Sequence, residues 1–465
     1  MLYRRNQKKQ SPSIMQKAQT KASISKSLFQ LAFPMIVSQA SDTCMMFIDR
    51  YFLSFLGKAH LSASMLGGLS SFFIMTLFFG INGYVNALVA QYYGAGKEKN
   101  CSLVLTQGII LSILAWPIIL LMQPLVYLLF ELSQPDRQQL PLQIQYFSIL
   151  STASPIALIR LSFASFFSGI GKSGIVMFAN VCGMLINIPF TYAMVFGEFG
   201  FPRLEMQGAA YGTVLASLCS SLILVVAYLQ KANIKRFDIL KSFYFDGENF
   251  KKLLYYGFPF GIELFLNIAA FNLAMQQFHT YGLDFAAAVS IVMNWELVAF
   301  LPMIGLSFAT TSMVGRKMGA KKSEDAEEVV YAALRFAFYY CLSIAIVFFL
   351  FSKQLSAIFC SSNENFENAL FFAKKMLRIS SFYIFFDAWS LIVAAALRGA
   401  GDSIWPMGIS VAFHWFFTFV TLFLVRVILL PALPVWYFFI FLPLFQCFSL
   451  FLRFKRGHWR ALRIV

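Results

Sequence analysis

The sequence predicts an all-α membrane protein with twelve transmembrane helices in two pseudo-symmetric six-helix lobes. Hydrophobic residues make up 59% of the 465-residue chain and charged residues only 12%, about half the charged share of a soluble domain. Runs of roughly 20 apolar residues, each long enough to cross a bilayer, recur along the whole chain. Several short landmarks also occur twice, which indicates a duplicated unit.

The duplication rests on three pairs of landmarks that keep the same order in both halves. The longest landmark is an apolar helix that opens on a Gly and ends in Gly-Ala-x-Lys, and its two copies lie 225 residues apart. The paired landmarks are 80–97 with 305–322, Phe33-Pro34 with Phe258-Pro259, and 168–173 with 398–403. Internal repeats in a membrane chain are typical of secondary transporters.

Six spans are expected in an N-terminal lobe of residues 28–230. Pro34 lies in the first turns of the first span, and Gly94 ends the second. A polar loop with Pro135 and Pro141 precedes the fourth, and a Gly-x-Gly-Lys-Ser turn precedes the fifth. The expected spans are 28–55, 62–92, 102–129, 143–167, a fifth that ends at Phe196, and a sixth that ends near Leu229.

Six further spans are expected in a C-terminal lobe of residues 253–453. The segment 231–252 is the most polar interior stretch, so we expect a linker there, with room for an amphipathic surface helix. Residues 1–27 and 454–465 are expected to form tails. The expected spans are 253–281, 284–315, 326–352, 369–397, 404–429 and 432–453.

The net charge of +16 does not indicate nucleic-acid binding, because the basic residues gather in alternate loops between spans. Loops on the side of the tails and the linker hold 26 Lys and Arg, and loops on the other side hold 8. The positive-inside rule then places both termini in the cytoplasm. We therefore expect a multi-pass protein of the cell's inner (plasma) membrane.

Neither an enzyme nor a cofactor site is visible in the sequence. The seven Cys form no C-x-x-C pair, and the four His show no metal-binding spacing. No nucleophile with its base, and no cluster of His and Asp, falls at one depth of the membrane. We expect a protein that is not an enzyme and binds no cofactor.

Carboxylates inside the spans are the main candidates for function, because an ionised group in the bilayer core costs about 2.5–3.5 kcal/mol even on insertion scales. The candidates are Asp42, Asp49, Glu263, Glu296 and Asp387. One interpretation is structural pairing with a basic residue inside a span, which is favoured more for Asp42 and Glu296. The basic residues available are Arg50, Arg160 and Arg335. The other interpretation is a site for a proton or a cation.

Two pairs of polar residues lie one turn apart and so share a helix face. Glu263 and Asn267 together offer the oxygen atoms that a hard cation prefers. Asn187 and Thr191 form the second pair, which supports either a hydrogen bond between helices or a functional site. Na⁺ is the only metal ion that we consider for such positions.

The ordered set of motifs over about residues 28–450 resembles the multidrug and toxic compound extrusion (MATE) family. The second half contributes Asn294, eight residues before Pro302, and Asp387, ten before Leu397. The motifs of the first half are Pro34, Phe47-Ile48-Asp49, the Gly-Ala-x-Lys ending shared with the second half, Asn187-Ile188-Pro189, and Gly208-Ala209-Ala210 leading to Thr213.

The resemblance implies two six-helix lobes around an axis along the membrane normal, and a central cavity that opens to either face in turn. It also implies efflux of organic cations or other drug-like compounds, coupled to entry of H⁺ or Na⁺, by a monomer in the lipid bilayer. The N-lobe cation site would be Pro34, Asp49, Asn187, Thr191 and Thr213. The C-lobe site would be Glu263, Asn267, Asn294 and Asp387.

This sequence departs from the family at three positions. Thr191 stands where members often have Asp, Asn267 stands where they often have Glu, and Arg50 follows Asp49 in place of a small polar residue. The coupling ion and the lobe that binds it therefore stay open. The alternative function is a flippase for lipid-linked sugars or lipids of the same superfamily, which ranks lower because few basic residues are available to line a cavity.

Overall fold

The computed structural model describes residues 14–132, 138–358, 367–439 and 441–465, and within these ranges it contains helices and loops but no strand. Eleven helices in these ranges are long and apolar enough to cross a membrane. Two shorter ones, α5 (Gln139–Thr152) and α6 (Ser154–Gly169), meet at a bend of 46° and together make a twelfth span. The predicted all-α membrane fold with twelve spans is confirmed.

The first half of the chain forms the N-lobe. α2 and α3 make one span that is interrupted at Tyr84, because the chain turns slightly there before the helix resumes. With α5 and α6, the N-lobe consists of α1 (Ile14–Ser54), α2 (Lys58–Gly83), α3 (Val85–Gly94), α4 (Glu98–Leu132), α7 (Ser173–Phe196) and α8 (Met206–Tyr228).

The segment between the lobes holds the short helix α9 (Lys231–Phe237) and the 3-10 turn η1 (Ile239–Lys241). The first helix of the C-lobe, α10 (Gly247–His279), begins inside the predicted linker, because the Asp246 side chain caps it by accepting from the Glu248 N–H. The C-lobe continues with α11 (Leu283–Gly319), α12 (Ser323–Leu350), α13 (Ser352–Ala357), α14 (Glu367–Ala400), α15 (Ile404–Arg426), α16 (Ala432–Phe439), α17 (Phe441–Lys455) and η2 (His458–Ala461).

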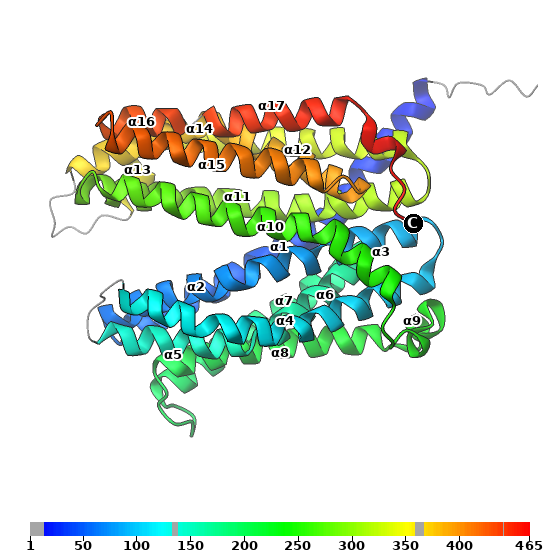
Figure 1. Cartoon of the computed structure of the whole chain (residues 1–465), viewed down its shortest axis with the longest axis horizontal. Coiled ribbons are helices and arrows are strands. Elements are labelled where there is room, and N and C mark those ends of the chain that lie inside the picture. The colour runs from blue at the N-terminus through cyan, green and yellow to red at the C-terminus, as the bar shows by residue number, and fades with distance from the viewer. Residues whose placement is uncertain (1–13, 133–137, 359–366, 440) are drawn as a thin grey trace, which may run out of the picture.

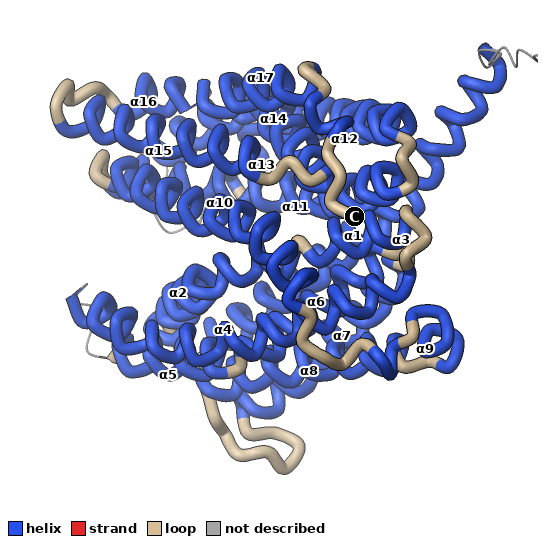
Figure 2. Tube along the Cα trace, turned by 45° about the vertical axis from the view of Figure 1, so that its right-hand side comes forward, coloured by secondary structure: helices blue, strands red, loops and turns tan. Residues whose placement is uncertain are grey.

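The two lobes lie side by side, with their helices along the long axis of the molecule (Figure 1). They meet at the end that carries α9 and the C-terminus. Toward the opposite end the ribbons of α2 and α10 spread apart, both in Figure 1 and in the turned view of Figure 2. The two helices α2 and α10 therefore diverge toward that end of the spans.

Glycines bring the two lobes into backbone contact along the spans. A Cβ atom at Gly80 in α2 would overlap the backbone of Gly261 in α10. A Cβ atom at Gly305 in α11 would overlap the backbone of Ile36 in α1. Since Gly305 follows Gly80 by 225 residues and Gly261 follows Ile36 by the same number, the second contact repeats the first with the lobes exchanged. Such an exchange is the signature of a twofold relation.

The repeated Gly-Ala-x-Lys endings form a second reciprocal contact. A Cβ atom at Gly94 would overlap the carbonyl of Arg316, and one at Gly319 would overlap the carbonyl of Gln91. Arg316 and Gln91 are again equivalent positions of the repeat. The landmarks that reveal the duplication are therefore also the points where the two lobes touch.

Buried hydrogen bonds reinforce the contact between the lobes. The Gln91 amide of the N-lobe donates to the Gly399 carbonyl at 2.8 Å. In the other direction, the Ser312 hydroxyl of the C-lobe donates to the Ser168 carbonyl at 2.6 Å. Removal of either donor would take a hydrogen bond from a buried carbonyl, which is unfavourable.

Each lobe also receives a segment from the other. Ile24 and Leu28 of α1 are buried in the apolar core of the C-lobe. At the other terminus, Ile464 is buried with the core of the N-lobe. Its side chain packs so close to Gly401 that a Cβ atom on that glycine would overlap it. Trp459 of η2 is buried as well. The segments 1–27 and 454–465, assigned to tails from the sequence, thus contain packed residues.

Filling the space at the contact glycines tests this packing. Gly94→Ala and Gly319→Ala each place a methyl group against a carbonyl of the other lobe, so both should lower stability by roughly 1–3 kcal/mol. Gly408→Ala in α15 is the matched control, because a Cβ atom there meets nothing within 4 Å. Thermal unfolding of the purified protein in detergent measures all three, and an equal Tm for Gly94→Ala and Gly408→Ala would contradict the contact.

Candidate functional site

A buried carboxylate lies where three helices of the N-lobe meet. Asp49 of α1 is 2% exposed. Its oxygens accept hydrogen bonds from the hydroxyl of Thr213 in α8 and, at 3.3 Å, from the hydroxyl of Thr191 in α7. Asn187, one turn before Thr191, donates to the Thr191 hydroxyl at 3.0 Å. The structure thus brings together four of the five residues predicted for an N-lobe site.

The atoms of this cluster suit a proton or a hard cation. The hydrogen-bond donors to Asp49 are neutral hydroxyls. The amide oxygen of Asn187 is buried and has no hydrogen-bond partner among the described residues. Carboxylate, hydroxyl and amide oxygens are the ligands that hard cations take. Within the described ranges, no group of three or more His, Cys, Asp or Glu is placed to hold a metal ion.

Asp42, on the same helix, has a different environment. Its carboxylate forms an ion pair with Arg160 of α6 at 3.1 Å. Asn180 of α7 accepts a hydrogen bond from the same guanidinium at 3.0 Å and donates one to the Asp42 carboxylate at 3.3 Å. The structural pairing that the sequence favours for Asp42 is therefore present.

The C-lobe carboxylate Glu263 is paired with a guanidinium. Arg398 at the end of α14 lies 3.0 Å from it, and the two side chains are among the most buried charged groups of the described residues. The guanidinium also lies 4.3 Å from the centre of the Phe260 ring. The sequence places Arg398 in a turn, whereas α14 continues to Ala400 and directs it inward. The charge of Glu263 is thus balanced by Arg398.

Asn267, one turn after Glu263, contacts the helices on its other side. Its amide donates to the Ser410 hydroxyl of α15 at 2.8 Å, and Gln446 of α17 donates to the same oxygen at 3.2 Å. The amide oxygen of Asn267 is buried without a partner among the described residues. Glu263 and Asn267 share a helix face, and Ser410 lies near both, so they belong to one polar network.

A second pair of carboxylates lies between α11 and α14. Glu296 accepts hydrogen bonds from the hydroxyls of Ser380 and Tyr383. Asp387 lies one turn beyond Tyr383 on the same face of α14, near enough for its charge to act on Glu296. Asp387 itself forms no hydrogen bond or ion pair with another described residue. Of the three C-lobe carboxylates predicted for the site, Glu296 and Asp387 are therefore the two that form no ion pair with a described basic residue.

Two of the predicted site residues lie apart from these clusters. Pro34 precedes Asp49 by 15 residues, roughly 22 Å along the helix, and lies beside the contact of Ile36 with the other lobe. Asn294 is exposed on α11, and its amide donates to the Ser290 carbonyl at 2.8 Å. Neither residue contributes an atom to the clusters around Asp49 or Asp387.

Sequence reasoning missed Ser380, Tyr383 and the inward position of Arg398. A signal for the first two was present, because Ser380 and Tyr383 stand seven and four residues before Asp387 and so share its helix face. No spacing links these residues to Glu296, or Arg398 to Glu263, because each of those contacts joins different helices.

Comparison with known proteins agrees with this architecture. A family model described as MatE matches residues 34–193 and 259–424, one segment in each lobe. The probable multidrug resistance protein NorM of Pasteurella multocida (strain Pm70) is 26% identical over 404 residues, which cover 84% of this chain and 84% of that protein. The probable multidrug resistance protein YoeA of Bacillus subtilis (strain 168) is 24% identical over 422 residues, with coverage of 87% and 88%.

A solved structure has the same fold. It is the outward-facing conformation of a multidrug resistance MATE family transporter of the MOP superfamily, with a TM-score of 0.85 and 20% identity. The match covers 94% of this chain and 97% of that one. The agreement over nearly the whole chain shows that the two-lobe arrangement is common to both proteins.

The ion pair of Glu263 and Arg398 predicts a non-additive effect on stability. Glu263→Gln or Arg398→Gln alone leaves one buried charge without its partner, which should cost about 3–5 kcal/mol. The double variant removes both charges, so it should recover most of that loss. Chemical unfolding in detergent of the two single variants and the double variant measures the coupling. Additive losses, or a Glu263→Gln variant as stable as the wild type, would show that the pair does not hold these helices.

Proposed function

The chain belongs to the MatE family of transporters, and from this premise we propose that it is a secondary active multidrug efflux transporter. It exchanges organic cations or other amphiphilic compounds for H⁺ or Na⁺ by alternating access. As a family member it is a transporter and not an enzyme, as the sequence predicts. The relatives with more than four-fifths coverage carry names of multidrug resistance proteins, which supports this choice of substrate class.

The observation that carries the proposal is the environment of Asp49. This carboxylate is almost fully buried, its hydrogen-bond donors are neutral hydroxyls, and it forms no ion pair with a described residue. It lies about 20 Å along α1 beyond the contact of Ile36 with the C-lobe, toward the end where the lobes spread apart. A proton or Na⁺ entering from that end would supply the missing positive charge.

Helix α1 connects the site with the contact between the lobes. Pro34 removes one helical hydrogen bond, so α1 can bend there. Cation binding at Asp49 changes how α1 packs against α7 and α8, and a bend at Pro34 carries this change to Ile36. The drug must bind better to the opposite state, because a ligand shifts an equilibrium only through its differential affinity. The pair Glu296 and Asp387 is the second candidate for the coupling site.

The position of the basic residues argues against a flippase for lipid-linked sugars. Arg160 is paired with Asp42, and Arg398 is paired with Glu263. Arg335 is exposed on α12. Of the three basic residues that the sequence places inside spans, Arg50 is then the one left to bind a diphosphate, whereas a flippase should offer several basic groups.

We further propose that the protein acts as a monomer in the inner (plasma) membrane, with both termini in the cytoplasm. The charge asymmetry of the loops supports this orientation. In this orientation the joined end of the lobes faces the cytoplasm, and the end where α2 and α10 spread apart faces outward. Asp49 would then take its cation from outside the cell.

Neutralising Asp49 should separate coupling from folding. Asp49→Asn keeps the hydrogen-bonding shape but cannot gain or lose a charge, so coupled efflux of an ethidium-like compound should fall at least about tenfold, the scale of a 1.4 kcal/mol change. Asp387→Asn should do the same if the C-lobe couples transport. Efflux from proteoliposomes under an imposed H⁺ or Na⁺ gradient measures both variants and also identifies the ion.

Asp42→Asn is the matched control, because Asp42 lies on the same helix but is held by Arg160. It should impair stability more than coupling. If Asp49→Asn and Asp387→Asn both transport at the wild-type rate under either gradient, the carboxylates are structural and the mechanism is wrong.

Cysteine labelling tests the orientation. In a background without native Cys, a Cys at Tyr244, whose side chain is 54% exposed, should react with a membrane-impermeant maleimide only after the cells are opened. Ser242 in the same segment is unsuitable because it is buried. A Cys at Phe199, 81% exposed in the loop after α7, should react in intact cells. The reverse pattern would contradict cytoplasmic termini.

A further inference from the structure

A groove of about 550 Å³ lies on the C-lobe, between α12 and α17. Helix α14 packs against both and forms its floor. In Figure 1 these three helices lie on the side of the C-lobe that is away from the N-lobe. The groove is therefore separate from the contact between the lobes and from the cluster around Asp49. Most of its lining is aromatic: Tyr331, Phe338, Tyr339, Trp389 and Phe451.

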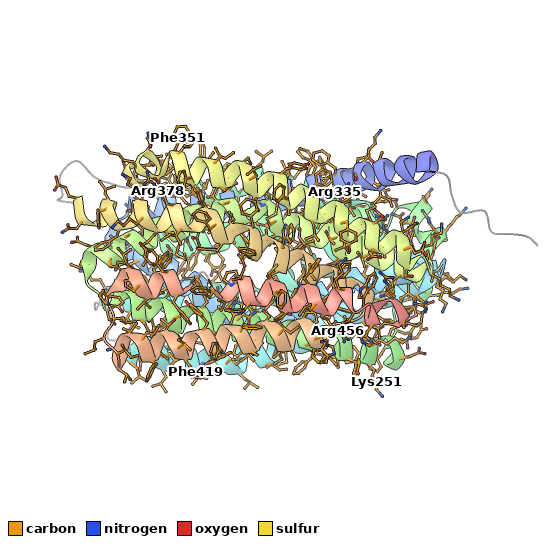
Figure 3. The ribbon with its side chains drawn as sticks, turned by 90° about the horizontal axis from the view of Figure 1, so that it is seen from above. Lys251, Arg335, Phe351, Arg378, Phe419 and Arg456 are labelled. Atoms are coloured by element: carbon orange, nitrogen blue, oxygen red, sulfur yellow. The ribbon has the colours of Figure 1, made fainter. Side chains whose placement is uncertain are left out.

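Arg335 is the charged residue of this groove that lies inside a membrane span. Figure 3 marks it on the ribbon of α12. It is exposed, and it forms no ion pair with a carboxylate of the described residues. The apolar part of α12 begins at Val329, so the Cα atom of Arg335 lies only about 9 Å into that part. Its side chain is long enough to place the guanidinium at the level of the lipid headgroups.

The other charges around the groove leave a place for an anion. Lys455 of α17 donates to the Tyr331 hydroxyl at 2.5 Å, and its ammonium lies 5.6 Å from the Phe451 ring centre. Glu328 lines the groove on the side toward the start of α12. The neighbouring Glu327 does not add free negative charge, because Arg460 pairs with it at 2.5 Å. Arg335 and Lys455 thus present two positive groups along the groove.

We propose that this groove binds an anionic phospholipid, with its phosphodiester on Arg335 and an acyl chain along the aromatic walls. A guanidinium only donates hydrogen bonds, so its ligand must be an acceptor, and phosphate oxygens match its geometry. The rings of Phe338, Tyr339 and Phe451 offer an apolar surface for the chain. Basic pockets between transmembrane helices are suited to anionic headgroups in this way. A free phosphate would share the contact with Arg335, but it has no acyl chain to lie along the aromatic walls.

Retention of lipid by the full-length protein tests the proposal. The detergent-purified wild type, Arg335→Gln, Arg335→Lys and Tyr339→Ala would be incubated with phosphatidylglycerol, with phosphatidylcholine or with inorganic phosphate. Native mass spectrometry counts the bound lipids, and thermal unfolding measures the stabilisation. Arg456→Gln is the matched control, because Arg456 is an exposed cation next to Lys455 that does not line the groove.

The wild type and Arg456→Gln should each retain one more phosphatidylglycerol molecule than Arg335→Gln. Arg335→Gln should bind the lipid about fivefold more weakly, as expected for the loss of one basic group near the membrane surface. Arg335→Lys should bind nearly as well as the wild type, and Tyr339→Ala should bind less of the lipid while folding normally. Equal binding by Arg335→Gln and the wild type would overturn the proposal. Equal protection by phosphatidylcholine, or by inorganic phosphate, would also overturn it.

Discussion

The arrangement of the two lobes depends on backbone-to-backbone contact at glycines. Between transmembrane helices in lipid there is little hydrophobic driving force, because the lipid tails are as apolar as the side chains, so close packing and hydrogen bonds hold the helices together. At Gly80, Gly94, Gly305 and Gly319 a side chain would overlap the backbone of the other lobe. The same close approach brings amide and hydroxyl groups within reach of carbonyls such as those of Ser168 and Gly399. The interface between the lobes at these four positions is therefore narrow and specific.

Sequence reasoning succeeded where the signal was periodic or repeated. Twelve apolar runs and paired landmarks were enough to predict the two-lobe fold, and the repeat positions proved to be the contact points. It also placed Asn187 and Thr191 on one face, because a separation of four residues determines that. It could not predict the partner of Glu263, since Arg398 belongs to another helix and its direction depends on how far α14 continues past the repeat motif. The pairing of Glu296 with Ser380 and Tyr383 depends in the same way on the packing of α11 against α14.

The two lobes share a fold but differ in the partners of the carboxylates inside their spans. In the N-lobe, Asp42 is paired with Arg160, and Asp49 is left with neutral partners on the same helix. In the C-lobe, Glu263 is paired with Arg398, and Glu296 and Asp387 lie together without a basic residue. Among these five candidate carboxylates, each lobe thus has one that is ion-paired and at least one that is not. A duplicated backbone therefore carries two sites that differ in the number of carboxylates without a basic partner: Asp49 in one lobe, and Glu296 with Asp387 in the other.

The exchange of segments between the lobes has a consequence for biogenesis. The beginning of α1 completes the core of the C-lobe, yet it leaves the ribosome long before α11, α12 and α14 exist. Ile464, by contrast, joins the core of the N-lobe only after every span has been made. Neither half can therefore reach its final packing while the other is missing. Until the C-lobe has been made, the helices synthesised first remain in the bilayer with lipid against part of the surface that they later bury. Although it is built from a repeat, the molecule matures as one unit and not as two domains in succession.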